Sequence, residues 1–301
     1  MVEPEENNNE PTSAFDELLP AEMAAKAQSI GIRKANLDFL STFALAVLAG
    51  AFIALGCIFF TISQTTGGVS MPWGVMRVIG GIAFSLGLIL VIVGGAELFT
   101  GNNLIIMAWA SRKLSTFRVV RNWGIVYLGN LCGAVATALF VFWSQHYTMD
   151  KGAVGVTALN IGLGKVNLGF AQALILGILC NAMVCMAVWL TYSARTVLGR
   201  ISAIIFPIAG FVAAGFEHCV ANMYFIPYSI LVKAGASDTF WQSSGVTSAN
   251  VTVATYSHLT WANFFVKNLI PVTIGNIIGG VFFVALVYWV IYLRNKGWKP
   301  A

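Results

Sequence analysis

The chain has 301 residues and a net charge of +5; 58% of its residues are hydrophobic, only 10% are charged, and its mean hydropathy is +0.79. This composition is far too apolar for a soluble domain of that length, so it excludes an ordinary globular protein. The main solvent of the chain is predicted to be lipid. The positive charge is attributed to membrane topology, and no nucleic-acid partner is inferred from it.

The first element is a predicted cytoplasmic tail, residues 1–38. It holds eight of the twelve carboxylates and has no early apolar stretch, which excludes a cleavable signal peptide. Within it, Pro20 suits the first position of a helix, and residues 21–35 contain few helix breakers. A short amphipathic helix at the membrane surface is therefore predicted, with a passive linker as the alternative.

Six largely apolar windows follow, each long enough to cross a bilayer, which takes about 20 residues. The second and the fifth are too long to be one plain span each. The sequence therefore predicts an all-α integral membrane protein with six transmembrane helices, a membrane domain over residues 39–293 and a short cytoplasmic tail over residues 294–301. The windows are Phe39–Ser63, Val75–Trp109, Val119–Trp143, Leu168–Tyr192, Ile201–Val232 and Phe264–Leu293.

Basic residues predict the orientation, because short positively charged loops stay on the cytoplasmic side of a membrane. Eleven of them flank the windows on one side and five fall on the other, so both termini are predicted to be cytoplasmic. The eleven are Arg33, Lys34, Arg112, Lys113, Arg118, Arg121, Arg195, Arg200, Arg294, Lys296 and Lys299; the five are Arg77, Lys151, Lys165, Lys233 and Lys267.

The two halves of the membrane domain, roughly residues 39–145 and 165–293, share two motifs in the same order. Gly95–Asn102 reads GAELFTGN and Gly215–Asn222 reads GFEHCVAN, so both fit GxExxxxN. Gly129–Val135 and Gly275–Val281 likewise share GNxxGxV. Each match alone is weak, because glycine and asparagine are common at helix interfaces. Two matches in the same order indicate an internal repeat.

A repeat of three spans must be inverted in the membrane, because an odd number of crossings reverses the direction of the next unit. Inverted repeats place the substrate path at their pseudo-twofold axis, where paired helices break near the bilayer midplane. Glycines mark both overlong windows: Gly94, Gly95 and Gly101 in one, Gly210 and Gly215 in the other. Interrupted backbone at that depth needs protein or a water-filled cavity around it, so these two breaks are the predicted pore.

Ionisable groups at membrane depth cost about 3 kcal/mol on insertion scales and therefore mark structural or functional sites. The candidates are Glu97, Glu217 and His218. The two glutamates are equivalent in the repeat, which predicts that both accept backbone N–H bonds at the helix breaks. His218 has Leu98 as its repeat partner, and this asymmetry favours a functional role for the histidine.

A histidine titrates near neutral pH, so His218 can offer a passing weak acid either a positive charge or a proton. A neutral histidine bonded to a backbone carbonyl is the structural alternative. Thr100 supplies a hydroxyl that can bond either the histidine or an anion oxygen. His146 and His258 lie in predicted loops and receive no role, and the five cysteines, which form no CxxC pair, predict neither disulfides nor a metal site.

At these motifs the chain resembles the formate/nitrite transporter family, from Leu19 to Leu293. The resemblance is carried by GAELFTGNNLI from Gly95, GILCNAMVCMAVW from Gly177, GFEHCVANMYFIP from Gly215 and NLIPVTIGNIIGG from Asn268. The last stretch, together with ELLPAEMA from Glu17, is most similar to the formate channels. The resemblance implies an aquaporin-like fold, homopentamers with one pore per protomer, and a place in the bacterial inner membrane.

The resemblance also implies a role for each residue at a matching position. His218 would be the central pore histidine with Thr100 as its partner, and Lys165 would draw anions toward the pore. The remaining roles are path lining by Asn181 and Asn276, an outer constriction of Phe84 and Phe211, an inner slit of Leu88 and Phe99, and support of the helix breaks by Glu97, Glu217, Asn102 and Asn222.

The predicted function is pH-sensitive passage of formate, with no enzymatic activity, cofactor or metal. A bare carboxylate loses much hydration energy in a ring of phenylalanines, whereas the neutral acid loses far less. The hypothesis is attraction by Lys165 and by the positive ends of broken helices, transient protonation at His218, and passage of the neutral acid. Anion passage beside a permanently neutral histidine fits the sequence equally well.

Three other functions remain as alternatives. A nitrite or hydrosulfide channel is the nearest, because the same residues serve any small weak-acid anion, other short carboxylates included. A membrane-embedded enzyme could use Glu217 and His218 for acid–base chemistry, but no second nucleophile, metal cluster or cofactor motif accompanies them. A pore for glycerol or water is disfavoured by the absence of paired NPA motifs.

Overall fold

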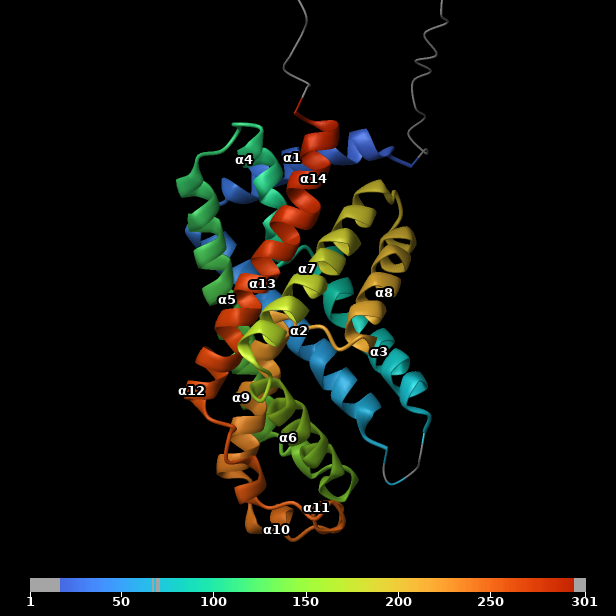
Figure 1. The fold of residues 1–301 in the computed structure, drawn as a ribbon, viewed down its shortest axis with the longest axis vertical. Helices are drawn as coiled ribbons and strands as arrows, with labels where there is room; N and C mark the ends of the chain where they lie inside the picture. The colour runs from blue at the N-terminus through green and yellow to red at the C-terminus, as the bar shows by residue number, and fades with distance from the viewer. Residues whose placement is uncertain (1–16, 67, 69–70, 295–301) are drawn as a thin grey trace, which may run out of the picture.

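The computed structural model describes residues 17–66, 68 and 71–294, and this part of the chain is built from helices and connecting loops without strands. Helices α1 (Pro20–Ala35) and α14 (Leu286–Tyr292) lie at one end of an elongated molecule, and the short α10 (Asp238–Trp241) and α11 (Ser244–Ser248) lie at the other (Figure 1). The acidic stretch before Glu17 and the predicted cytoplasmic Lys296 and Lys299 lie outside the described residues.

The remaining helices follow in chain order. They are α2 (Phe39–Gln64), α3 (Trp73–Gly94), η1 (Gly101–Ile105), α4 (Ile106–Ala110), α5 (Thr116–Trp143), η2 (His146–Thr148), η3 (Asp150–Gly152), α6 (Ala153–Val166), α7 (Phe170–Ser193), α8 (Val197–Ala213), α9 (Cys219–Gly235), η4 (Val253–Tyr256), α12 (Trp261–Asn263), η5 (Phe264–Leu269), α13 (Ile270–Gly280) and η6 (Val281–Ala285).

Within the described residues, five helical segments are long and apolar enough to cross a membrane: α2, α3, α5, α7 and the run Val253–Tyr292. The fifth predicted window is instead two helices of 17 residues each, α8 and α9, on either side of a break. The chain is therefore a multi-pass membrane protein, as its composition predicts. The count of six spans stays a prediction.

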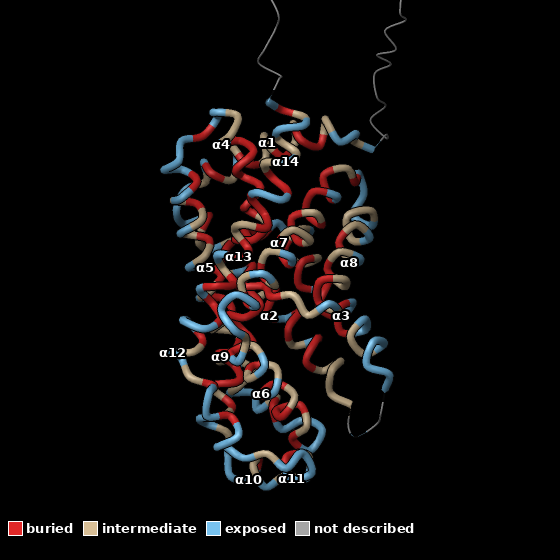
Figure 2. The backbone as a smooth tube through the Cα atoms, in the orientation of Figure 1, coloured by how far each residue is buried: buried red, intermediate tan, exposed pale blue. Residues whose placement is uncertain are grey.

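The outer faces of these helices carry large apolar side chains that the fold leaves exposed, while buried residues run along the middle of the molecule (Figure 2). Phe206 on α8 is 81% exposed, and Phe140 on α5 is 68% exposed. In water such surfaces would be costly, whereas lipid tails or a neighbouring subunit accommodate them.

Polar residues directly before the helices set where several of them begin. A side-chain oxygen of Asp38 accepts the backbone N–H of Ser41, and Ser115 and Thr196 cap α5 and α8 in the same way. Such caps satisfy backbone donors that have no partner inside the helix, and each stabilises its helix by about 1 kcal/mol.

Helix α1 confirms the short helix predicted over residues 21–35. It begins with Pro20 at its first position and buries small residues at a spacing of about one turn, among them Ala24, Ala27 and Gly31. Gly31 approaches the backbone of Ile105, so α1 packs on η1 and α4. Its location at the membrane surface stays a prediction.

Both predicted helix breaks are present. Helix α3 ends at Gly94 and is followed by Gly95, with φ +83°; the chain then runs without regular structure before η1. Helix α8 ends just before Gly215, with φ +78°, and α9 begins after His218. These two glycines are equivalent in the repeat, and a left-handed backbone conformation of this kind favours glycine over any residue with a side chain.

The second shared motif, GNxxGxV, marks two equivalent helix contacts. Helix α5 packs on α2, and a Cβ added to Gly133 would lie 1.9 Å from the carbonyl oxygen of Val47. Helix α13 packs on α7, and a Cβ on Gly279 would lie 2.1 Å from the carbonyl oxygen of Ile178. The glycines therefore let the backbones approach more closely than any other residue allows.

We expect Gly133→Ala to destabilise the protein by about 1–3 kcal/mol, because the methyl group forces α5 away from α2. Gly124→Ala is the matched control: it lies on the same helix, and an added Cβ there meets nothing within 4 Å. The comparison is the unfolding temperature of the two purified variants in detergent. Equal unfolding temperatures would contradict the close approach.

Candidate functional site

One asparagine holds each helix break. The side-chain N–H groups of Asn130 donate to the carbonyls of Ala46 and Glu97, and its Oδ1 accepts the N–H of Phe99. Asn276 repeats this pattern in the second half, donating to the carbonyls of Gly177 and Glu217 and accepting the N–H of Cys219. Both asparagines are fully buried, so the broken backbone at each site is satisfied inside the protein.

The glutamate of the first shared motif also forms a partly buried ion pair with a lysine at each break. Lys34 Nζ lies 2.9 Å from Glu97 Oε1 and 3.0 Å from Asn102 Oδ1, and the Asn102 amide donates to Glu97 Oε2 at 2.7 Å. The prediction that Glu97 accepts backbone N–H bonds is wrong, because lysine and asparagine side chains occupy its carboxylate.

The second half repeats this network. Lys165 Nζ lies 2.8 Å from Glu217 Oε1, and the Asn222 amide donates to Glu217 Oε2 at 2.7 Å. Asn268 completes it with bonds to Glu217 and to the carbonyl of Lys165. The prediction of backbone bonds to Glu217 is therefore wrong as well. These carboxylates position the breaks through lysine and asparagine side chains.

His218 and Thr100 bring the two breaks together. Thr100 Oγ1 lies 2.9 Å from His218 Nε2, and both side chains are buried. His218 Nδ1 accepts the backbone N–H of Ala221 at 3.1 Å, so the histidine is also the cap that begins α9. The sequence predicted the threonine–histidine partnership, and the distance confirms it.

These two bonds fix where the hydrogen of a neutral His218 resides. Because Nδ1 accepts from Ala221, the ring hydrogen sits on Nε2 and donates to Thr100 Oγ1. The Thr100 hydroxyl then has its own hydrogen to donate elsewhere. An imidazolium could form only by breaking the bond between Nδ1 and Ala221. In this arrangement the Thr100 hydroxyl, oriented by His218, is the group of the pair that still has a hydrogen to donate.

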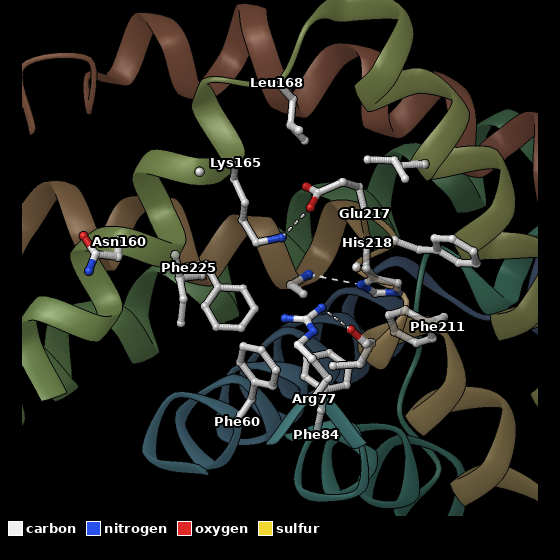
Figure 3. A pocket seen from close by; sticks show the side chains of 17 residues that line it. Phe60, Arg77, Phe84, Asn160, Lys165, Leu168, Phe211, Glu217, His218 and Phe225 are labelled. Atoms are coloured by element: carbon white, nitrogen blue, oxygen red, sulfur yellow. Dashed lines mark hydrogen bonds and ion pairs between the residues drawn. The ribbon is translucent and has the colours of Figure 1, made fainter. Parts of the chain in front are cut away.

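On one side of this pair lies a cavity of about 300 Å³, which we call the Lys165 chamber (Figure 3). Lys165 and Arg77 both point into it, and His218 lies at its edge beside Phe211. The polar and aromatic side chains that line it are Arg77, Asn160, Lys165, Glu217, His218, Phe60, Phe84, Phe211, Phe216 and Phe225.

On the other side lies a cavity of about 450 Å³, the Lys34 chamber, between α1 and the first break. Its lining contains four cations, Lys26, Arg33, Lys34 and Arg200, and one carboxylate, Glu97. Burial lowers the pKa of Lys26, and the positive charges of Arg200 and Arg195 lower it further. The chamber is therefore strongly favourable for an anion.

The two chambers approach each other along α3. Phe84 lines the Lys165 chamber, and Leu88, one turn later and about 6 Å along the helix axis, lines the Lys34 chamber. Gly101, next to Thr100, also lines the Lys34 chamber. The hydrogen bond between Thr100 and His218 thus lies at the boundary between the two chambers.

The predicted constriction residues divide into two groups. The rings of Phe84 and Phe211 meet edge to face with centroids 5.7 Å apart, at the inner wall of the Lys165 chamber. Leu88 lines the other chamber, but Phe99 packs against Trp123 and Tyr127 and is not among the lining residues. Leu98 lines that chamber beside Leu88 instead.

Asn181 and Asn276, predicted to line the path, are fully buried and line neither chamber. The Asn181 amide donates to the carbonyls of Thr100 and Asn276, which ties the first break to α13. Asn276 has both amide hydrogens and its oxygen committed to backbone partners. The structure thus brings both residues to the site as supports of the backbone around Thr100 and His218.

Sequence reasoning missed three residues of this site. Lys34 was assigned to topology alone, although KANLDF from Lys34 and KVNLGF from Lys165 form a further shared stretch that pairs the two lysines. Leu98 was noted only as the partner of His218. Arg77 was counted only among the five basic residues on the non-cytoplasmic side, and no sequence signal shows that it lines a chamber. Within the described residues, no group of histidines, cysteines or carboxylates could hold a metal ion.

Comparisons with known proteins agree on one family. A family model described as formate/nitrite transporter matches residues 21–290. The chain is 47% identical over 282 residues to the formate channel FocA of Escherichia coli K12, covering 94% of this chain and 97% of that protein. It is 41% identical over 263 residues to FocA of Haemophilus influenzae, covering 87% and 90%.

Solved structures give the same result. A chain described as a pentameric formate channel with formate bound superimposes with a TM-score of 0.79 at 44% identity, covering 85% of this chain and 98% of that one. A chain described as an FNT family ion channel superimposes with a TM-score of 0.73 at 27% identity, covering 90% and 98%.

Proposed function

Because the chain belongs to the formate/nitrite transporter family, we propose that it is a membrane channel for formate, assembled as a homopentamer with one path in each protomer. Members of this family are transporters, so the chain is not an enzyme. The pentamer is inferred from the structural relative described as a pentameric formate channel.

The observation that carries this proposal is the buried bond between Thr100 and His218 at the junction of two cationic chambers. Cations at both ends of a path raise the local concentration of an anion. An apolar stretch at the junction admits only a small, weakly hydrated species. A single hydroxyl donor there, oriented by His218, compensates in part for the hydration that a carboxylate loses.

The orientation of the histidine refines the mechanism. A neutral His218 with its hydrogen on Nε2 has no acidic proton to give, so it acts first as an aligned hydrogen-bond donor through Thr100. Protonation of formate at this point requires an imidazolium, and the α9 cap bond must open for that species to form. We propose that passage depends on pH and that the opening of this bond is the cause.

We also propose a bacterial inner-membrane location with both termini in the cytoplasm. Arg112 and Lys113, between α4 and α5, and Arg195, between α7 and α8, lie in turns at the same end as α1 and α14 (Figure 1). This grouping matches the tendency of basic turns to remain cytoplasmic. The Lys34 chamber then faces the cytoplasm, and the Lys165 chamber faces the outside.

The aromatic pair Phe84–Phe211 is proposed to set the size limit for passage. We expect Phe211→Ala to raise the rate of acetate relative to formate about tenfold, because acetate is larger by one methyl group and a tight apolar site discriminates against such a group by about that factor. Phe206→Ala on the same helix is the control, because that ring is 81% exposed and faces away from the chamber. An unchanged acetate-to-formate ratio would place the size limit elsewhere.

The experiment that tests the substrate is competition in liposomes. Uptake of labelled formate by the purified channel is measured with unlabelled nitrite, hydrosulfide or acetate present. The proposal expects formate itself to compete best. If nitrite or hydrosulfide displaced formate at lower concentration, the chain would be a channel for that anion on the same architecture. Conversion of the label to another compound would revive the alternative of a membrane-embedded enzyme.

A further inference from the structure

The guanidinium of Arg77 has an unusual position among the cations that line the chambers. It projects from the first turns of α3 into the Lys165 chamber (Figure 3). Nη2 donates to the carbonyl of Val212 at 2.6 Å, and Nε donates to the carbonyl of Ala213 at 3.1 Å. Arg77 therefore caps the last turn of α8, directly before the second helix break.

The other neighbours of this guanidinium are aromatic. Its central carbon lies 5.9 Å from the ring centroid of Phe60 and 5.9 Å from that of Trp73. Two carbonyls and two ring faces hold the group in place, and none of them carries a formal charge. Within the described part of the chain, Arg77 forms no ion pair, and the nearby Glu217 acts on it only from a longer distance while pairing with Lys165.

Lys165, unlike Arg77, forms an ion pair. Among the described residues that line this chamber, Glu217 is the single carboxylate, and its Oε1 lies 2.8 Å from Lys165 Nζ. An anion passing this ion pair meets a lysine and a glutamate whose fields largely cancel. The sequence assigned the attraction of anions to Lys165, but the pair as a whole is nearly neutral.

The C-terminus of α8 lies at this chamber and carries a negative charge that a cation would offset. A helix C-terminus carries a partial negative charge of roughly half a unit, and its last carbonyls have no partner within the helix. At the Lys165 chamber these carbonyls would repel an incoming anion. Arg77 donates to the carbonyls of Val212 and Ala213, the first of which also accepts the N–H of Gly215, and its charge offsets the negative end of the helix.

We propose that the Lys165 chamber is a binding site for small monovalent anions and that Arg77 supplies the positive charge of this site; this proposal rests on the proposed function. Lys165 and Glu217 position the helix break, and Arg77 concentrates the anion in front of it. Removal of Arg77 both deletes a positive charge and uncovers the negative end of α8.

The test is the initial rate of labelled formate uptake into liposomes at low formate concentration, in low and high concentrations of an impermeant salt. We expect Arg77→Gln to lower this rate about threefold to tenfold at low salt, the effect of one charge a few ångströms away in a water-filled chamber. High salt should reduce the difference between the variant and the wild type, because it screens exposed charge.

Two further variants separate the charge from the helix cap. Arg77→Lys keeps the charge and should retain most of the rate and its salt dependence. Asn160→Asp adds a negative charge to the same chamber without touching the bonds of Arg77, because Asn160 contributes only an acceptor for the Tyr256 hydroxyl. It should lower the rate as Arg77→Gln does, and it keeps the proposal testable if that variant fails to assemble.

Lys151→Gln is the control, because it removes an exposed positive charge from the same side of the protein without lining a chamber. Its rate should equal that of the wild type. The inference is overturned if Asn160→Asp and Arg77→Gln both leave the low-salt rate unchanged, or if Arg77→Lys loses as much as Arg77→Gln. A wild-type protein that moves no formate would instead contradict the proposed function.

Discussion

Replacing His218 with asparagine is expected to lower formate flux about tenfold to a hundredfold at each pH between 5 and 8, the effect of losing one hydrogen bond to a charged group. Asparagine is a good helix cap, so α9 should still begin at the same residue. Its shorter side chain does not reach Thr100, which then loses the donor that orients its hydroxyl. The measurement is uptake and efflux of labelled formate in liposomes.

A second variant checks that the effect arises at this bond. Thr100→Val removes the hydroxyl and should lower the flux by a similar factor, and the double variant should be little worse than either single one, because both changes remove the same interaction. If His218→Asn moved formate at the wild-type rate in both directions across this pH range, the histidine would have no part in permeation.

Replacing Glu217 with leucine is expected to destabilise the protein by about 3–5 kcal/mol, the usual effect of removing one partner of a buried ion pair. The Lys165 ammonium would remain largely buried without its carboxylate, and the amides of Asn222 and Asn268 would each lose an acceptor. The unfolding temperature of the purified protein in detergent measures this change.

The double variant Lys165→Met with Glu217→Gln is the control for charge. It removes both members of the pair and keeps an oxygen acceptor for Asn222, so we expect it to be more stable than Glu217→Leu alone. A Glu217→Leu protein that unfolds at the wild-type temperature would show that the network does not hold the break.

The sequence predicted the parts of this fold that follow from repeated local patterns. The two glycine-marked breaks, the short helix before the first span and the family were all predicted, because each depends on residues close together in the chain or on a long motif. The structure confirms the breaks at Gly95 and Gly215, and the comparisons confirm the family.

The partners of the buried carboxylates were predicted less well, because they come from distant segments. Lys34 reaches Glu97 because α1 folds back onto the first break, and in the sequence this approach is signalled only by the match of Lys34 to Lys165. Phe99 was predicted to form the inner slit. Its backbone N–H makes the bond to Asn130 that the second half repeats at Cys219, but its side chain packs against Trp123 and away from the chamber. Side-chain direction at an irregular break depends on tertiary packing.

The places where the repeat symmetry fails are the ones that carry the proposed function. Glu97 and Glu217, and Asn130 and Asn276, make equivalent bonds in the two halves. His218 stands opposite Leu98, so the symmetric scaffold supports one asymmetric polar pair. The sequence located this asymmetry, while its geometry and the charge of each chamber required the structure.

Formate passage is tested most directly by the rate of labelled formate uptake into liposomes that contain the purified wild-type protein, compared with protein-free liposomes of the same lipid. We expect uptake that scales with the amount of assembled protein and is suppressed in the Thr100→Val variant. Uptake no faster than in protein-free liposomes, from protein shown to be folded and assembled, would contradict a formate channel.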